Sequence, residues 1–211
     1  AVGRAHGSHL AALSQGVDHR PVEPDRAVKS IGHEETFARD LMSHEEVWGE
    51  IVRLSDAVAS RLRHAGVGAR TVSLKIRFNT FATITRSVTL PGAVATGPAI
   101  CAAVEPLLAA VDVTAGVRLV GVSGSNLGPV SEQLTLFDAA AAAHDPSTDS
   151  PRSQADWSSA SEALDNIRSR FGSGAIGPAR SMRNGSVRPV RPGEQQWGPD
   201  GQPPSGPSPS R

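Results

Sequence analysis

The residues from 72 to 79 alternate between apolar and polar side chains, and this pattern restricts the fold more than any other feature of the chain. The apolar members are Val72, Leu74, Ile76 and Phe78, and the polar members between them are Ser73, Lys75, Arg77 and Asn79. A period of two is typical of a β-strand with one buried face and one face in water. The chain therefore contains a sheet whose two sides have different surroundings.

A long amphipathic helix is predicted from residue 44 to about residue 64. Ser43 has the chemistry of an N-cap, and Glu46 stands three residues later, which is the spacing of a capping box. Apolar residues then recur at spacings of three and four, which places them on one helical face. This stripe consists of Val47, Ile51, Leu54, Val58 and Leu62, and Gly66 and Gly68 are predicted to end the helix.

The remaining elements complete a four-stranded arrangement. Strands are predicted at residues 27–37, 82–90 and 117–124, and a second helix at residues 99–111 despite Pro106. Asn79 and Thr80 give a weak turn signal, and residues 91–98 are predicted to form a loop. The order β-α-β-β-α-β is that of a split βαβ fold, an α+β arrangement in which both helices cover one face of the sheet. The other face is predicted to be open.

The two ends of the chain differ in composition from this core. Residues 1–18 are helix-like, with Gly16 as a C-terminal stop, and residues 19–24 form a linker. Because the chain begins inside a predicted helix, we interpret it as a fragment of a longer protein. Residues 139–211 have the composition of a disordered tail, apart from a short helix at 159–171 that places Ala163, Ile167 and Phe171 on one face.

Cysteine content and hydropathy exclude several classes of protein. Cys101 is the only cysteine, so no disulfide framework or cysteine-based zinc site can form within the chain. It lies in an apolar run and is predicted to be an inert core thiol. No stretch reaches the roughly 20 apolar residues that span a bilayer, and no signal peptide is visible. We therefore expect a cytoplasmic protein without a membrane partner.

Charge is distributed unevenly, although the formal net charge is zero. The long helix is acidic, whereas the strand segments are basic and rich in serine and threonine. Their cations are Arg26, Lys29, Lys75, Arg77, Arg86 and Arg118, and they stand against Glu34 and Glu35. Arginine and hydroxyl groups contact phosphate oxygens without reading a base sequence, so the open face favours nucleic-acid binding. A merely solvated face is the alternative interpretation.

Arg86 does not fit this simple picture. Its parity along the strand is that of the apolar residues Ile84 and Val88, so it is expected to point toward the core. Either a β-bulge near Ser87 re-aims its side chain, or the register of the strand differs from the predicted one.

Residues 133–137, with the sequence Gln-Leu-Thr-Leu-Phe, form the sharpest short motif and follow the patterned core. Apolar side chains left together in water are typical of an interaction site. Gln133 offers an amide that orients a peptide, and the motif offers three apolar side chains for pockets on a partner: Leu134, Leu136 and Phe137. The alternative is that these residues fold back onto their own domain as an edge strand.

Several ordered segments resemble the C-terminal region of the DinB-type, Y-family DNA polymerases of bacteria. Residues 29–37 resemble the start of the little-finger domain, residues 75–91 its central hairpin, and residues 117–127 its last strand. Residues 3–22 resemble the end of the thumb domain, and residues 133–137 are similar to the bacterial sliding-clamp motif. Residues 165–172 are similar to the tail of actinobacterial members. The resemblance divides the chain into a thumb end with linker (1–24), a little finger (25–128), a clamp-binding peptide (129–138) and a tail (139–211).

In that family the thumb and little finger hold the template-primer duplex, and the parent enzyme copies damaged DNA with low fidelity. The resemblance implies DNA-backbone contacts at Lys29, Ser30, Gly32, Arg77, Thr83, Thr85, Arg86 and Arg118, and at Gly3 and Gly7 through their N–H groups. It implies binding of the bacterial β sliding clamp by Gln133, Leu134, Leu136 and Phe137. Many relatives carry basic residues where Val88 and Ser123 stand, so a weaker electrostatic grip is expected here.

The family's catalysis depends on palm carboxylates that bind Mg²⁺, and no such pair is recognised in this chain. The carboxylates of the long helix fit a solvated face, and the histidines lack the spacing of a metal site. The resemblance therefore implies that palm and fingers domains are further partners. This chain, without a cofactor of its own, is not expected to polymerise DNA.

Two other functions fit the same features. The chain could be a standalone, non-catalytic module that occupies the clamp or a nucleic acid. It could also be a general split-βαβ RNA-binding domain, which would expose aromatic side chains on its central strands for base stacking. Phe78 has the parity of the buried face, and aromatic residues make up only 4% of the chain, which disfavours the RNA-binding interpretation.

Overall fold

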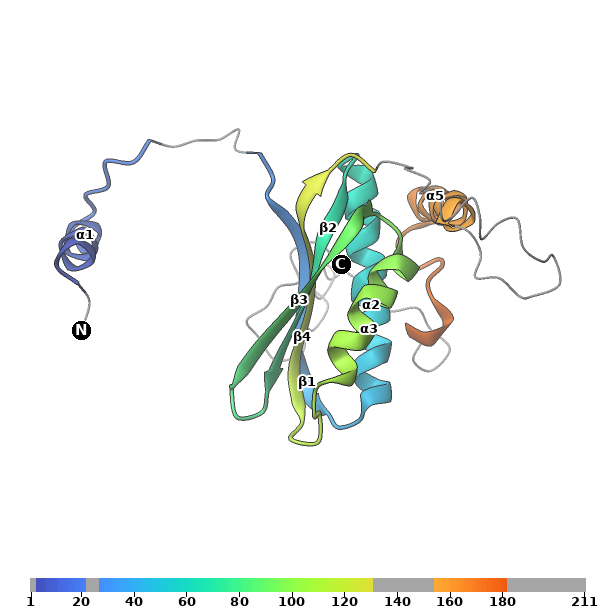
Figure 1. Ribbon diagram of the computed structural model, residues 1–211, viewed down its shortest axis with the longest axis horizontal. Coiled ribbons are helices and arrows are strands. Elements are labelled where there is room, and N and C mark those ends of the chain that lie inside the picture. The colour runs from blue at the N-terminus through green and yellow to red at the C-terminus, as the bar shows by residue number, and fades with distance from the viewer. Residues whose placement is uncertain (1–2, 22–26, 131–153, 182–211) are drawn as a thin grey trace, which may run out of the picture.

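A four-stranded antiparallel sheet with two helices on one side forms the body of the protein (Figure 1). The computed structural model describes residues 3–21, 27–130 and 154–181. The elements of the body are β1 (Ser30–Leu41), α2 (His44–His64), β2 (Gly68–Phe78), β3 (Thr83–Val94), α3 (Gly97–Ala109) and β4 (Val117–Gly128). The sheet order is β1-β4-β2-β3, so β4 separates β1 from β2, and β2 separates β4 from β3. This arrangement confirms the predicted split βαβ fold.

Helix α2 packs its apolar stripe against the sheet as predicted. Val47, Ile51, Leu54, Val58 and Leu62 are all completely buried. The Ser43 side chain accepts a hydrogen bond from the Glu46 N–H at 3.2 Å, and the Glu46 carboxylate accepts one from the Met42 N–H at 2.8 Å. Both contacts satisfy amide groups at the start of the helix, which otherwise lack partners.

The predicted ends of several elements are wrong by a few residues. Gly66 ends α2 with a left-handed φ of 66°, but Gly68 already belongs to β2. β1 begins and ends later than predicted, and β4 continues to Gly128. β3 runs through Pro91 into the predicted loop, which is tolerated because β3 is an edge strand and one side of its backbone needs no partner.

Buried charge also joins α2 to β1. The Arg53 side chain is 6% exposed and forms ion pairs with Glu50 on its own helix and with Glu35 on β1. A buried guanidinium is stable only where carboxylates compensate it. This triad fixes the helix against the edge strand.

The N-terminal helix and Cys101 agree with their predicted character. Helix α1 (Arg4–Ser14) ends before Gly16, which has a φ of 75°, and none of its residues is buried. Cys101 is half-buried on α3, and burial raises the pKa of its thiol to about 11. A thiol with such a pKa is largely unreactive at neutral pH.

Among the described helices, none has the length and apolar character to cross a membrane.

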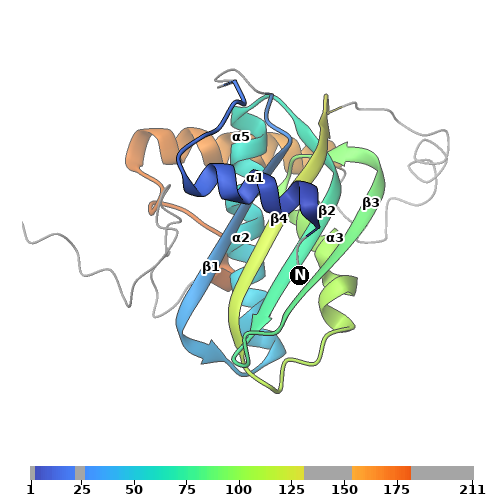
Figure 2. The same ribbon diagram turned by 90° about the vertical axis from the view of Figure 1, so that its left-hand side faces the viewer.

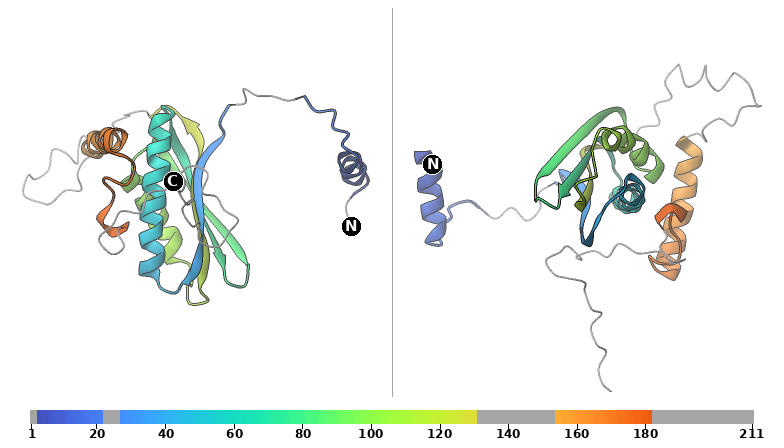
Figure 3. Two further views of the ribbon diagram at one scale, coloured as in Figure 1. Left: turned by 180° about the vertical axis from the view of Figure 1, so that it is seen from behind. Right: turned by 90° about the horizontal axis from the view of Figure 1, so that it is seen from below.

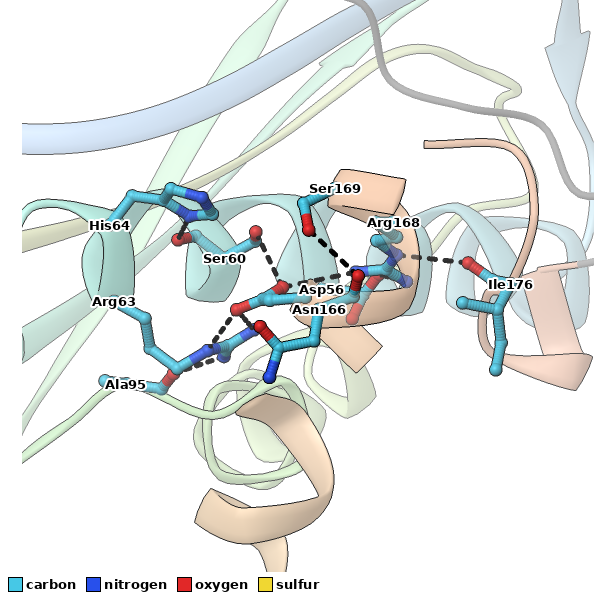
Figure 4. A network of polar contacts seen from close by, with 10 residues as sticks. Asp56, Ser60, Arg63, His64, Ala95, Asn166, Arg168, Ser169 and Ile176 are labelled. Carbon is cyan, nitrogen blue, oxygen red and sulfur yellow. Dashed lines mark hydrogen bonds and ion pairs between the residues drawn. The ribbon is translucent and has the colours of Figure 1, made fainter. Parts of the chain in front are cut away.

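The C-terminal tail contains a longer helix than predicted, and this helix lies against the body. Helix α5 (Gln154–Phe171) lies beside α2 on the side away from the sheet (Figures 1 and 3). The Asp165 carboxylate accepts from the Arg63 guanidinium at 2.7 Å and from the Ser60 hydroxyl at 2.9 Å. The Arg168 guanidinium contacts the Asp56 carboxylate at 2.7 Å (Figure 4). The side chains of these ion pairs are between 13% and 19% exposed.

The apolar face predicted for this helix is not the face that contacts the body. Ala163, Ile167 and Phe171 do share a face, but they are exposed, and Phe171 is 70% exposed. Periodicity identified the helix but not the side that contacts the body, because partly buried ion pairs attach the polar side. The predicted helix at residues 159–171 is thus present but begins earlier, at Gln154, and the short 3₁₀ helix η1 (Ala179–Ser181) follows it in a stretch that was predicted to be disordered.

Removal of the Asp165 carboxylate is expected to release α5 and leave the sheet intact. In Asp165→Ala, Arg63 and Ser60 lose their acceptor in a partly buried site, which costs about 1–3 kcal/mol. Hydrogen–deuterium exchange of the α5 amides is expected to accelerate, while amides of β2 and β4 stay protected. Glu162→Ala, at an exposed position of the same helix, serves as the control. Equal loss of protection in the central strands would contradict this local role.

Candidate nucleic-acid interface

The sheet face opposite α2 and α3 is turned toward the viewer in Figure 2, and the strand register gives it mainly small and hydroxyl side chains. Strand pairing places cross-strand partners on the same face, so the members follow from the register of the buried residues. β2 contributes Thr71, Ser73, Lys75 and Arg77, and β3 contributes Thr83, Thr85, Ser87 and Thr89. β1 contributes Ser30, Gly32, Glu34 and Thr36, and β4 contributes Leu119, Gly121, Ser123 and Ser125. We call this set the open face.

Polar contacts organise the open face without neutralising all of its cations. The Arg77 guanidinium donates from Nε to the Thr83 hydroxyl at 2.9 Å. The Thr71 and Thr89 hydroxyls lie 3.0 Å apart. Lys75 Nζ pairs with the Glu34 carboxylate at 2.7 Å, a pairing that the sequence did not predict. Because Arg77 contacts only a neutral hydroxyl in these bonds, its positive charge remains available to an anion.

A bulge in β4 brings Arg118 to the same region. Arg77 pairs with Leu119, whereas the next residue, Phe78, pairs with Val117, so Arg118 is the extra residue of the strand. Simple alternation from the buried Val120 would turn Arg118 toward the core, and a bulge re-aims such a side chain. The bulge thus brings Arg118 to the end of the open face, next to Leu119 and over the Phe81 ring, which periodicity within the strand does not predict.

Arg86 does not belong to the open face. It pairs with Leu74, which is 2% exposed on the helix-covered side, and the β2–β3 register has no irregularity near Ser87. Neither explanation offered by the sequence holds: β3 has no bulge at Ser87, and it keeps the register that its parity predicts. Arg86 avoids burial because β3 is the edge strand, and its side chain is exposed on the side of the sheet that carries the helices.

Two glycines keep the middle of the open face flat. A Cβ atom on Gly32 would lie 2.6 Å from the Ser123 Cβ, and one on Gly121 would lie 2.9 Å from the Glu34 Cβ. The two glycines line a shallow hollow together with Glu34, Lys75 and Ser123. The absence of a Cβ atom at both positions allows β1 and β4 to lie close together here.

The other predicted contact residues differ in exposure, and some of them lie outside the described residues. Lys29 and Ser30 are exposed at the start of β1, and Thr85 is exposed on β3. On α1, Gly3 is the N-cap, and the Gly7 N–H donates to the Gly3 carbonyl at 2.8 Å, so the Gly7 amide is used within the helix. Gln133, Leu134, Leu136 and Phe137 lie outside the described residues. Within the described part of the chain, no three His, Cys, Asp or Glu side chains gather as a metal site.

Phe81 is a candidate that the sequence interpretation did not identify. It lies in the turn between β2 and β3, has a φ of 66° and is 66% exposed. The Arg118 guanidinium lies over its ring, 5.2 Å from the centroid. The signal in the sequence is an aromatic residue directly after the weak turn signal at Asn79 and Thr80.

Comparisons with known proteins agree on one family. Residues 28–136 match the impB/mucB/samB family C-terminal domain. The DNA polymerase IV of Halorhodospira halophila is 44% identical over 137 residues, which are 64% of this chain and 38% of that protein. The DNA polymerase IV of Streptomyces coelicolor is 39% identical over 139 residues, 66% of this chain and 29% of that protein. The chain thus spans well under half the length of these relatives.

The structure of this chain is weakly similar to a chain in a solved complex of beta-clamp processivity factor and little finger domain of PolIV. The similarity covers 51% of this chain and 97% of that chain, with 24% sequence identity and a TM-score of 0.41. A similarity of this extent does not support a conclusion about function.

Substitution of Gly32 by alanine is expected to destabilise the sheet. The added methyl group would overlap with Ser123 and approach the Val122 carbonyl oxygen at 3.1 Å, and overpacking of this kind costs about 1–3 kcal/mol. Gly92→Ala is the matched control, because a Cβ at this β3 position meets nothing within 4 Å. Urea unfolding of both variants measures the difference in the free energy of unfolding. Equal values would show that β1 and β4 can move apart at Gly32 without a cost in stability.

Proposed function

Because this chain belongs to the impB/mucB/samB family of C-terminal domains, we propose that it is the DNA-holding and clamp-binding part of a DinB-type translesion DNA polymerase. The open face carries the proposal. Arg77, Arg118 and the hydroxyl groups around them lie on one uncovered side of a rigid sheet. The two DNA polymerase IV relatives match this chain over 137 and 139 residues.

The chemistry of the open face suits the DNA backbone rather than the base edges. Arginine guanidinium and threonine or serine hydroxyl groups donate to phosphate oxygens and position a duplex without specifying its sequence. The flat centre at Gly32 and Gly121 removes side chains that would hold the duplex away. Glu34 offsets the charge of Lys75, so the grip on DNA is weak in electrostatic terms and tolerates movement along the duplex.

The remaining roles belong to the same proposal. Gln133, Leu134, Leu136 and Phe137 bind the β sliding clamp and keep the polymerase at replicating DNA. Palm and fingers domains supply the Mg²⁺-dependent chemistry, and this chain binds the DNA duplex. The protein acts in the cytoplasm, where bacterial DNA is replicated and repaired.

Arg77→Ala is expected to weaken duplex binding equally for all sequences, because one phosphate contact is lost. The slope of log affinity against log salt is expected to fall by about 1. Fluorescence anisotropy with a labelled duplex over a salt series measures both quantities. Arg86→Ala is the matched control, since Arg86 lies on the other side of the sheet, and its slope is expected to stay unchanged. Equal effects of the two substitutions would contradict the assignment of the open face.

The double variant Leu136→Ala/Phe137→Ala is expected to lose binding to a purified bacterial β clamp. Binding of the unchanged chain is expected in the micromolar range, and bare-DNA affinity is expected to survive in the variant. Ile167→Ala/Phe171→Ala, which removes exposed apolar side chains from α5, is the control for nonspecific hydrophobic contact. Loss of clamp binding in both variants, or retention in both, would contradict a specific role of the motif.

A further inference from the structure

The backbone at Phe81 holds an aromatic side chain out into water at an energetic cost. A φ of 66° is rare for a bulky residue, and the ring is 66% exposed although Arg118 lies over it. The Phe81 N–H donates to the Phe78 carbonyl at 2.9 Å and closes the turn. Strained backbone persists where the surrounding contacts fix it, and such positions concentrate at binding sites.

The contacts that fix this turn come from the open face. The Thr83 hydroxyl donates to the Phe81 carbonyl at 3.5 Å and accepts from Arg77 Nε at 2.9 Å. The Asn79 N–H donates to the Gly116 carbonyl at 3.1 Å, which ties the turn to the start of β4. The turn that carries the ring is therefore tied to the end of the open face, with Arg118 over the ring and Arg77 linked to the turn through Thr83.

We infer that Phe81 stacks on an unpaired nucleobase of DNA whose adjoining duplex lies on the open face. This inference rests on the proposed function. An aromatic ring beside cationic groups is the combination that binds single-stranded nucleic acid, because every base has a π-face and every nucleotide a phosphate. The arginine over the ring adds a cation–π contact and covers only part of its surface. Bases inside a duplex are already stacked on both sides, so the ring selects a base outside the paired region.

Anisotropy with two DNAs tests this inference. One is a blunt duplex, and the other is the same duplex with a single-stranded extension that contains 2-aminopurine, whose fluorescence falls on stacking. The unchanged chain is expected to bind the extended DNA more tightly and to quench the probe. Phe81→Ala is expected to weaken binding of the extended DNA roughly 5- to 100-fold, to abolish quenching, and to leave blunt-duplex affinity within about twofold. Phe81→Trp is expected to retain both properties.

Phe171→Ala is the matched control. Phe171 is also an exposed phenylalanine with an arginine over its ring, at 5.6 Å from Arg170, but it lies on α5 away from the sheet. Its removal is expected to change neither affinity. Equal losses for Phe171→Ala and Phe81→Ala, or unchanged quenching in Phe81→Ala, would overturn the inference.

Phe81→Gly separates binding from stability. Glycine adopts a positive φ without strain, so the thermal midpoint of this variant is expected to stay equal or rise while the preference for extended DNA disappears. A lowered midpoint would assign the ring to the fold and overturn the inference. If the chain binds neither DNA, the proposed function fails together with the inference. If it binds both and Phe81 variants behave like the unchanged chain, only the inference fails.

Discussion

One-sided burial of the central strands is the constraint from which the rest of the structure follows. β2 and β4 pair along nearly their whole length and bury Val72, Leu74 and Ile76 under α2. Because side chains alternate in a strand, each residue turned toward α2 leaves its neighbour on the opposite face. The hydrophobic packing that stabilises the domain thereby also produces a rigid, flat and polar surface on the other side.

Arginine has opposite roles on the two sides of this sheet, and burial decides which. Arg53, Arg63 and Arg168 are at most 15% exposed and each pairs with a carboxylate, since a buried cation is unstable without one. They attach β1 and α5 to α2. Arg77 and Arg118 lie against a hydroxyl and an aromatic ring at the open face, and neither of these partners neutralises their charge. The zero net charge of the chain conceals this separation.

Much of the fold was predictable from local patterns, and the errors share one cause. The bounds of α2, its cap and its buried stripe agree with prediction because they depend on residues three or four apart. The extension of β3 through Pro91 was missed because it depends on the strand's place at the sheet edge. Ion pairs between residues about 100 positions apart attach α5 by its polar side, and no periodicity within α5 reveals them.

The sequence by itself determined the elements, their order, the apolar faces of α2 and β2, and the family. Only the tertiary structure decided which cations share a surface. It assigned Arg118 to the open face through a bulge, removed Arg86 from it through pairing with Leu74, added Glu34 beside Lys75, and placed Phe81 under Arg118. The physical reason is that periodicity is set within one segment, whereas register, bulges and ion pairs are set between segments that are distant in the chain.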